Sequence, residues 1–138
     1  MKLLRIIFWS LIVCNYAYAE VNYFSEGLEF FNKKKLNEAK FKFEQDLVFN
    51  PKNEKSYLYL SKIFNAQDNK EYEEKNLNTV LLLNPKNEEA VYNLAKLKLK
   101  QSDYSLSKEL ADKLISLCKI YCEKANNLKT EIENSQKK

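Results

Sequence analysis

The sequence predicts an all-α chain built from stacked helix-turn-helix units, and three observations lead to this prediction. The 138 residues include one Gly and two Pro, whereas Lys, Glu, Leu, Asn and Ala are abundant, a balance that favours helices joined by short loops. The segment NPKNE at residues 50–54 recurs unchanged at residues 84–88, displaced by 34 residues. Small and apolar residues recur at the same displacement along the rest of the chain.

Three repeated units follow from this displacement: residues 20–53, 54–87 and 88–121. Small residues at one repeated position would let two helices approach closely, and apolar residues at two others would form stripes buried between helices. The small set is Gly27, Ser61 and Ala95; the apolar sets are Leu47, Leu81 and Ile115, and Phe49, Leu83 and Leu117.

The repeated NPKNE segment has the composition of a turn between helices. Each proline, Pro51 and Pro85, comes just after an apolar helical run that it cannot continue. Asn53 and Asn87 are good N-caps for the next helix, and acidic residues follow where negative charge suits the helix dipole. Every unit is therefore predicted to be helix, turn, helix.

These units resemble the tetratricopeptide repeat (TPR), whose 34-residue pattern is W-x2-L-G-x2-Y, then A-x3-F, then P. The resemblance covers nearly all of the chain after residue 19. The matching residues are Tyr23, Gly27, Phe30, Ala39, Phe43 and Pro51 in the first unit; Tyr57, Leu60, Ser61, Phe64, Leu77 and Pro85 in the second; and Val91, Leu94, Ala95, Ser107 and Ala111 in the third.

Some residues depart from this pattern. Glu73 stands where a small Ala is expected between packed helices, so we expect the helix pair of the second unit to be splayed or shifted. Lys98 and Lys119 replace an aromatic residue and the proline of the third unit, which is typical of a terminal repeat. Residues 122–138 are predicted to form a C-terminal capping helix and a short frayed tail, because Tyr121, Ala125, Leu128 and Ile132 lie at helical spacing with polar residues between them.

Residues 1–19 have the features of a secretory signal peptide. Lys2 and Arg5 precede an apolar stretch at residues 6–13, and residues 17–19 (AYA) form a cleavage pattern, so we expect cleavage after Ala19. An uncleaved anchor is disfavoured because the apolar stretch is shorter than the ~20 residues that span a bilayer. Lipidation of Cys14 is disfavoured because bulky Val13 precedes it. The mature chain would be nearly neutral, with intermixed charges, which does not favour nucleic-acid binding.

The sequence offers no constellation for catalysis. It contains no His, which is the usual general base and the commonest metal ligand. A mature chain with one Gly has no Gly-rich phosphate loop, and we find no Asp-rich calcium loop. We therefore expect no enzyme activity, no cofactor and no metal site.

Cys118 and Cys122 are the two cysteines of the mature chain. In an oxidising compartment such a pair indicates a disulfide, but on one continuous helix their Cβ atoms would be too far apart for a bridge. The repeat frame aligns Cys118 with Asn50 and Asn84, which places residues 118–121 in a turn. We favour a Cys118–Cys122 disulfide over free thiols, and both alternatives remain open.

The TPR resemblance implies a short right-handed superhelix whose first helices line a concave groove that binds a protein or peptide. Carrying over the groove positions gives a surface that is apolar at one end and basic at the other: Phe24, Leu28, Phe31, Leu58, Lys62, Tyr92, Lys96 and Leu99. Lys62 and Lys96 occupy the same position in successive units and would suit a ligand carboxylate. TPR domains that bind chaperone tails have Lys and Asn where this chain has Phe24 and Leu28, so that activity is not transferred.

Two functions remain open from the sequence. The first is an exported adaptor that binds a protein or peptide partner in the cell envelope, most simply the periplasm of a Gram-negative bacterium, without stable membrane insertion. The alternative is a structural TPR protein that associates with its own copies through the apolar first-repeat face, so a homo-oligomer is possible.

Overall fold

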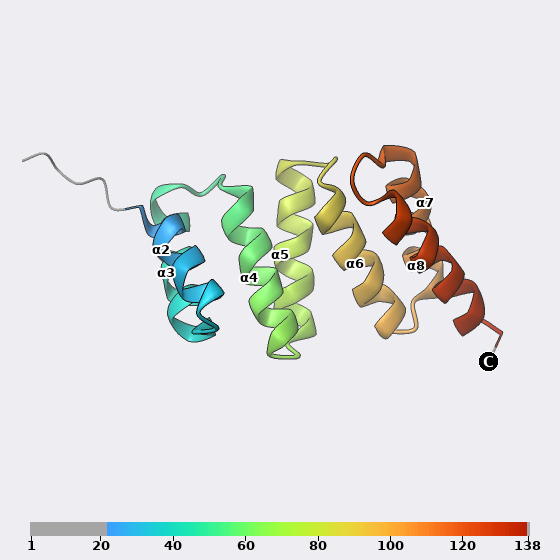
Figure 1. Cartoon of the computed structure of the whole chain (residues 1–138), viewed down its shortest axis with the longest axis horizontal. Coiled ribbons are helices and arrows are strands. Elements are labelled where there is room, and N and C mark those ends of the chain that lie inside the picture. The colour runs from blue at the N-terminus through green and yellow to red at the C-terminus, as the bar shows by residue number, and fades with distance from the viewer. Residues whose placement is uncertain (1–21, 138) are drawn as a thin grey trace, which may run out of the picture.

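The computed structural model describes residues 22–137, and within this range the chain forms seven α-helices. They pack as antiparallel hairpins in a single row, each helix mainly against its neighbours in sequence (Figure 1). Together with the helical content, this arrangement confirms the predicted all-α class. The helices are α2 (Tyr23–Asn32), α3 (Leu36–Phe49), α4 (Glu54–Ala66), α5 (Lys70–Leu83), α6 (Glu88–Lys100), α7 (Tyr104–Leu117) and α8 (Cys122–Ser135).

The predicted signal peptide, with Cys14 and the cleavage position after Ala19, lies outside the described residues. Among residues 22–137, no helix has both the length and the apolar character needed to cross a membrane.

The helix boundaries follow the predicted turn signals. The helices α3 and α5 end one residue before Asn50 and Asn84, and each proline comes next. The Asn53 side chain accepts a hydrogen bond from the backbone of Lys55 at 3.2 Å, and the Asn87 side chain accepts one from Ala90 at 3.0 Å. These caps satisfy backbone donors that the first turn of a helix leaves free.

The turn inside each hairpin has the same geometry in all three units. A residue with positive φ follows each first helix, at Lys34, Asp68 and Ser102, again 34 residues apart. The next N–H donates to a carbonyl five residues earlier, as from Lys35 to Phe30 at 3.0 Å. This is the Schellman closure, which usually has Gly at the left-handed position. Because non-glycine residues occupy it here, the composition did not reveal this turn.

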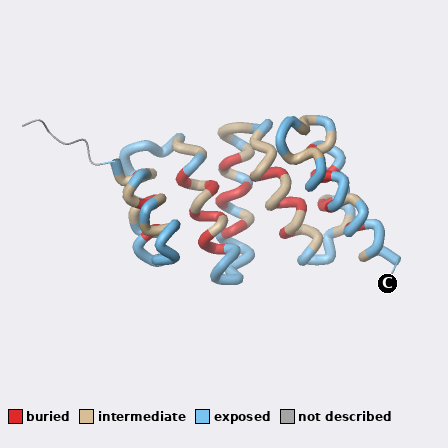
Figure 2. Tube along the Cα trace, viewed as in Figure 1, coloured by how far each residue is buried: buried red, intermediate tan, exposed pale blue. Residues whose placement is uncertain are grey.

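The core runs through the row of hairpins between the two layers of helices (Figure 2). One cluster joins α2, α3 and α4 around Phe43 and Ile63, and a second joins α4 to α8 around Leu77, Leu97 and Leu114, all of which are almost fully buried. Because α4 contributes to both clusters, it packs both against the first hairpin and against the helices that follow.

The repeated small positions are buried as predicted, whereas the repeated apolar positions are at most half-buried. Gly27, Ser61 and Ala95 are buried between helices. Phe49, expected in a buried stripe, is instead 68% exposed and stacks on Tyr23 with ring centroids 5.5 Å apart. It is the last residue of α3.

The two identical NPKNE turns are held by different contacts. The carboxylate of Asp46, 3% exposed, accepts hydrogen bonds from Asn53 at 2.6 Å and from the hydroxyl of Ser56. The equivalent residues one unit later are Val80 and Ala90, both fully buried in the apolar core. The junction between the first and second units therefore contains a buried polar pair, and the junction between the second and third units contains an apolar pair at the same positions.

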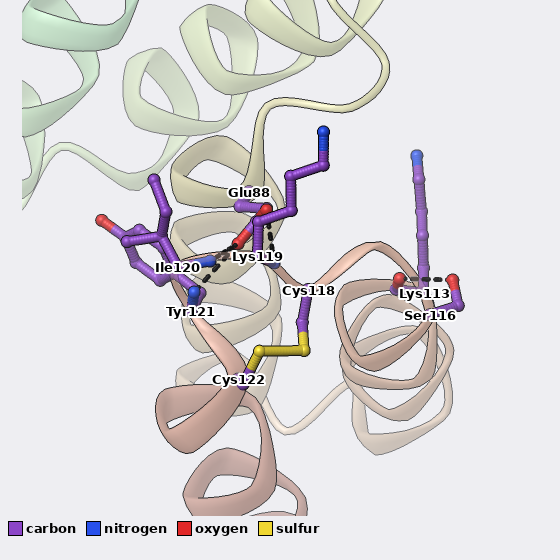
Figure 3. Close-up of a disulfide and its surroundings, with 8 residues drawn as sticks. All are labelled: Glu88, Lys113, Ser116, Cys118, Lys119, Ile120, Tyr121 and Cys122. Carbon is purple, nitrogen blue, oxygen red and sulfur yellow. Dashed lines mark hydrogen bonds between the residues drawn. A yellow bond between two sulfur atoms is a disulfide. The ribbon is translucent and has the colours of Figure 1, made fainter.

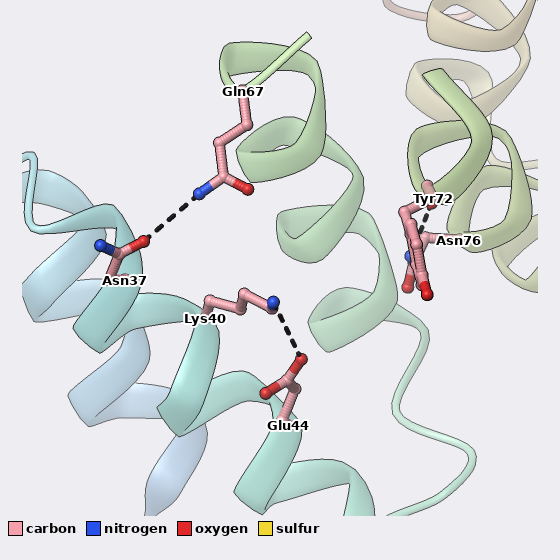
Figure 4. A network of polar contacts seen from close by, with 6 residues as sticks. All are labelled: Asn37, Lys40, Glu44, Gln67, Tyr72 and Asn76. Carbon is pink, nitrogen blue, oxygen red and sulfur yellow. Dashed lines mark hydrogen bonds and ion pairs between the residues drawn. The ribbon is translucent and has the colours of Figure 1, made fainter. Parts of the chain in front are cut away.

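Polar contacts also cross the outer edge of the first two units. Gln67, at the C-terminal end of α4, donates from its amide to Asn37 of α3 at 3.4 Å (Figure 4). Nearby, Lys40 of α3 forms an ion pair with Glu44 at 3.8 Å and lies over the Phe64 ring, 5.1 Å from its centroid. Such exposed pairs contribute little stability each, so the apolar contacts dominate this interface.

The C-terminal segment forms the predicted capping helix. Ala125, Leu128 and Ile132 are buried against the preceding helices. The helix α8 continues to Ser135 and so extends into the segment that was expected to be a frayed tail.

The close approach of α2 and α3 leads to a first prediction. A Cβ atom at Gly27 would lie 2.7 Å from Cε1 of the fully buried Phe43 ring. We expect Gly27→Ala to lower the free energy of unfolding by about 1–3 kcal/mol, although Ala is the better helix former. Urea denaturation measures the change. Ser105→Ala, at an exposed position of α7, is the control and should stay within about 0.5 kcal/mol of wild type. A Gly27→Ala variant as stable as wild type would contradict this packing.

Candidate partner-binding groove

The first helix of each hairpin and the capping helix form one continuous face, α2–α4–α6–α8, which we call the groove face. Side chains connect its neighbouring helices along the whole row: Phe31 of α2 meets Tyr59 of α4 at 5.1 Å between ring centroids, and Tyr92 of α6 meets Tyr121 at the start of α8 at 5.5 Å. Between them, Lys62 of α4 pairs with Glu89 of α6. This is the surface on which the sequence placed the binding residues.

A cavity of about 160 Å³ lies in the groove face between α4 and α6. It brings together three of the eight predicted groove residues, Lys62, Tyr92 and Lys96. The other lining residues, which the sequence reasoning did not assign to the groove, are Ser61, Asn65, Glu73, Asn93, Leu97 and Lys100.

The predicted apolar end of the groove is largely filled by its own side chains. Phe24 packs against Phe43 and Tyr59, at 5.7 and 6.0 Å between centroids, and Phe31 packs edge-on against Tyr59. Leu28 is half-buried in the same cluster. Tyr59 was not predicted as a groove residue, although it follows Leu58 directly in α4. The apolar end is therefore an aromatic wall with only part of its surface accessible.

The assignment of Leu58 to the groove surface needs correction, because its side chain is 7% exposed and belongs to the core between α4 and the following helices. A residue this buried offers almost no surface to a ligand. Leu99 is half-buried and packs against the same core, so it contributes only part of its side chain.

The lysines of the groove face differ in their surroundings. The ammonium of Lys62 lies 2.8 Å from a carboxylate oxygen of Glu89 and 4.4 Å from the centroid of the Tyr59 ring. Lys96 lies over the Tyr92 ring at 5.6 Å. Lys124 of α8, which the sequence reasoning treated only as part of a cap, lies 5.7 Å from the Tyr92 centroid and 4.4 Å from that of Tyr121.

Glu73 of α5 lies at the wall of the cavity and is 4% exposed. The expected splaying of this helix pair is not observed: α4 and α5 stay closely packed, and the side-chain amide of Asn65 donates to the Glu73 carboxylate at 2.8 Å. Burial raises the pKa of Glu73, and the hydrogen bond from Asn65 and the charge of Lys100 offset only part of this effect. The buried carboxylate thus costs stability at neutral pH.

The turn between α7 and α8 sets the C-terminal end of the groove face (Figure 3). The structure joins Cys118 and Cys122 by a disulfide, with Cα atoms 5.0 Å apart, at the end of α7 and the start of α8. Because the helix is interrupted here, the geometric conflict between a bridge and a continuous helix does not arise.

Glu88, the first residue of α6, binds the backbone of this turn. Its carboxylate accepts hydrogen bonds from the N–H groups of Lys119, Ile120 and Tyr121 at 2.8 to 2.9 Å (Figure 3). The bonds from Ile120 and Tyr121 are the main reason why the pKa of Glu88 lies below its usual value. Sequence reasoning assigned Glu88 only to the first turn of its own helix.

The contact is repeated one unit earlier. Glu54, the equivalent first residue of α4, accepts a hydrogen bond from the Asn84 side chain at 3.1 Å. In both cases the first acidic residue of a unit binds the turn that leads out of that unit, so each turn is fixed to the helix beside it. Cys118 takes the place of Asn84 in the last turn, where Glu88 binds the backbone directly.

Among residues 22–137, no group of three or more Cys, Asp or Glu side chains is arranged to hold a metal ion.

The fold is shared with known TPR domains. The chain is similar to the first TPR domain of Spaghetti (RPAP3) bound to the HSP90 peptide SRMEEVD, with a TM-score of 0.75 and 14% identity over 84% of this chain and 91% of that one. It is similar to the TPR2B domain of yeast Sti1 in complex with pHsp70, with a TM-score of 0.75 and 14% identity over 81% and 94% of the two chains. The Sgt2 TPR domain of Aspergillus fumigatus gives 0.71 and 20% over 84% and 80%.

These similarities show that the chain has the TPR fold, a class of stacked helical hairpins, and at these identities they show the fold alone. Neither a protein-family model nor a curated protein sequence matches the chain.

The contact of Glu88 with the last turn leads to a second prediction. Because the pKa of Glu88 in the folded state is lowered, its contribution to stability is present above the ordinary value of 4.5 and is lost as the pH falls through the folded-state pKa. We expect Glu88→Gln to weaken the hydrogen-exchange protection of the amides of residues 119–121 at pH 7 and to flatten the loss of thermal stability in acid.

The control for this measurement is Glu109→Gln, which removes the same charge at an exposed position of α7. If protection of residues 119–121 is the same in wild type and Glu88→Gln, the carboxylate does not hold the turn.

The buried carboxylate of Glu73 leads to a third prediction with the opposite sign. Because its folded-state pKa is raised, Glu73 stabilises the fold less as the pH rises from its ordinary value of 4.5 through the folded-state pKa. Glu73→Gln keeps an acceptor for Asn65 and should therefore increase the free energy of unfolding at pH 7, with the gain shrinking below about pH 4. Denaturant titrations at both pH values measure this, with exposed Glu71→Gln as the control. If Glu73→Gln instead lowers the free energy of unfolding at pH 7, the folded structure favours the charged carboxylate of Glu73 and the prediction is wrong.

Proposed function

We propose that this chain is a TPR adaptor that binds a segment of a partner protein along its groove face, and that it does so in the cell envelope after export. The observation that carries the proposal is the cavity between α4 and α6, where Lys62, Tyr92 and Lys96 come together on adjacent first helices. An accessible cavity with ammonium groups and an aromatic ring suits polar recognition of an extended chain.

The similar solved structures support the same class of function. The Spaghetti domain is bound to an HSP90 peptide, and the Sti1 domain is in complex with pHsp70. Transfer of those particular ligands is not supported, because Phe24 and Leu28 occupy positions where chaperone-tail binders have Lys and Asn, and both pack against the aromatic wall. The proposal is therefore peptide binding by the same face with a different specificity.

Export and the absence of catalysis complete the proposal. The charged, apolar and small-residue segments of residues 1–19 favour secretion with cleavage after Ala19. A disulfide between Cys118 and Cys122 fits an oxidising compartment such as the periplasm. A chain without His gives no support for a catalytic role.

The alternative is self-association without a separate ligand. The apolar surface first expected to mediate it is partly covered, since Phe24, Leu28 and Phe31 pack around Tyr59. Most of the exposed large apolar side chains lie on second helices instead, among them Val48 and Leu82 at equivalent positions, 77% and 81% exposed. Size exclusion with light scattering decides this alternative, because a strict monomer removes it.

The adaptor is tested by crosslinking in cells followed by co-purification of wild type and of a Lys62→Glu/Lys96→Glu variant. We expect recovery of the partner to fall about tenfold or more, because charge reversal replaces attraction with repulsion in the groove. The matched control is Lys52→Glu/Lys86→Glu, which reverses two exposed lysines in the repeated turns. Helix content and melting temperature establish that both variants fold. Equal recovery from wild type and the groove variant would contradict binding at this face.

A further inference from the structure

The turns that join successive units lie along one edge of the row of hairpins. These turns, residues 50–53, 84–87 and 118–121, connect α3 to α4, α5 to α6 and α7 to α8. All three lie at the upper edge of the stack in Figure 1, and the turns inside the hairpins lie at the lower edge. We call the three turns, together with the last turn of α3 and of α5, the turn edge.

The turn edge carries most of the exposed large apolar side chains. Among residues 22–137, six such side chains are exposed, and four of them lie at this edge with 68% to 86% of their surface accessible: Val48, Phe49, Leu82 and Ile120. The rings of Pro51 and Pro85 are exposed in the same turns. Because these residues come from successive units, the apolar groups are distributed along the edge.

Lysines are exposed beside these apolar groups. Lys52 and Lys86 directly follow the two prolines, and Lys55 lies in the first turn of α4. Within the part of the chain that the structure describes, none of the three forms an ion pair with a carboxylate within 4.0 Å. Their charges are therefore available to an external anion.

The carboxylates at the first two turns are engaged inside the protein. Glu54 accepts a hydrogen bond from a side-chain amide of the following turn, and the buried Asp46 accepts hydrogen bonds from its own turn. Glu88 accepts three backbone N–H groups, and Glu89 is paired with Lys62. The edge at these two turns thus presents positive charge with little exposed negative charge beside it.

The last turn contributes an apolar side chain without adding net charge. Ile120, 86% exposed, takes the position that lysine has in the other two turns. The charge of Lys119 is offset by Glu88, whose carboxylate accepts a hydrogen bond from the Lys119 backbone at 2.8 Å. Exposed Lys124 is likewise next to exposed Glu123. The positive charge of the turn edge therefore comes from its first two turns.

We propose that the turn edge docks on the surface of a membrane that contains anionic phospholipids. The apolar side chains Val48, Leu82 and Ile120 enter the boundary between headgroups and acyl chains, and Lys52 and Lys86 lie at the lipid phosphates. Binding of this kind combines burial of apolar area with attraction of lysines to an anionic surface, and it needs no helix that spans the bilayer. It goes beyond groove binding, because it uses the ends of the helices and leaves the groove face accessible to a partner.

A lipid surface suits this edge better than a second copy of the chain does. Two copies that met at their turn edges would bring two basic surfaces together, with few exposed carboxylates to compensate. A stable protein interface also buries about 800 Å² of each partner in one contiguous patch, whereas the apolar groups here are distributed along an edge. Lipid headgroups can move apart around separate side chains, so the spacing does not hinder docking.

The test is flotation of the exported, purified chain with vesicles of phosphatidylcholine alone or of equal parts phosphatidylcholine and phosphatidylglycerol. We expect binding to the anionic vesicles to be about tenfold stronger or more, and to weaken as salt is added. Lys52→Glu/Lys86→Glu should weaken it about tenfold, and Leu82→Ser/Ile120→Ser about threefold or more. All variants share one N-terminus, so differences between them report on the turn edge.

The matched control is Lys35→Glu/Lys70→Glu, which makes the same change in net charge at exposed positions of the opposite edge and should bind vesicles as wild type does. Helix content and melting temperature establish that each variant folds. The variant Lys52→Glu/Lys86→Glu also separates the two proposals, because it should lose the vesicles and still recover the crosslinked partner of the groove.

Four outcomes would overturn the inference. Equal binding of wild type to both kinds of vesicle would exclude attraction to anionic lipid. An equal loss in the control variant would show that only net charge matters, and unchanged binding of Leu82→Ser/Ile120→Ser would show that no apolar side chain enters the membrane. A dimer in light scattering that the same variant abolishes would identify a second copy as the occupant. None of these results affects the adaptor, which the groove variant tests on another face.

Discussion

Each hairpin in this chain has an apolar face that only the next hairpin can bury, and the structure depends on this constraint. The helix α4 shows it most clearly: Ile63 and Phe64 pack toward the first hairpin, whereas Leu58 belongs to the cluster that continues to α8. Stacking in one direction is the arrangement that buries all of these faces. The groove face follows from it, since stacking aligns the first helices side by side and brings equivalent residues of successive units together.

Apolar stacking alone would leave the turns at the ends of the hairpins free to move, and polar contacts fix them. Glu54 and Glu88, at the start of successive first helices, each bind the turn that leads out of their unit. In the last unit this contact and the disulfide act on the same few residues. The end of the stack, where no further hairpin packs, is thus the place where the chain uses a covalent bond.

The sequence predicted the fold well because repetition reveals both helix boundaries and buried positions. The 34-residue displacement located the hairpins, Asn53 and Asn87 indicated their caps, and Gly27 marked the close helix approach. It predicted the site less well. Leu58 proved buried, because a repeat pattern says which helix face a residue lies on and not how deeply its neighbours cover it.

Specific side-chain contacts between helices were also invisible to this reasoning. The pattern aligned Glu73 with a small residue and predicted disruption, whereas Asn65 on the neighbouring helix accommodates the carboxylate. The ion pair of Lys62 with Glu89, which reduces the availability of Lys62 to a ligand, joins the second unit to the third. The repeat alignment compares each residue with its equivalents in the other units. It therefore gives no information about which residues at different repeat positions are in contact.

The difference between the two NPKNE turns means that the units, although similar, are not interchangeable. Asp46 lies in the second helix of one unit and Ser56 in the first helix of the next, and the corresponding pair one unit later is Val80 and Ala90. If gene duplication inserted a second copy of residues 54–87 directly after the first, Val80 would face the Ser56 of the new copy, whose buried hydroxyl would lose its carboxylate acceptor. Lengthening this solenoid by simple duplication is therefore disfavoured, and growth of the array would require a compensating change at the new junction.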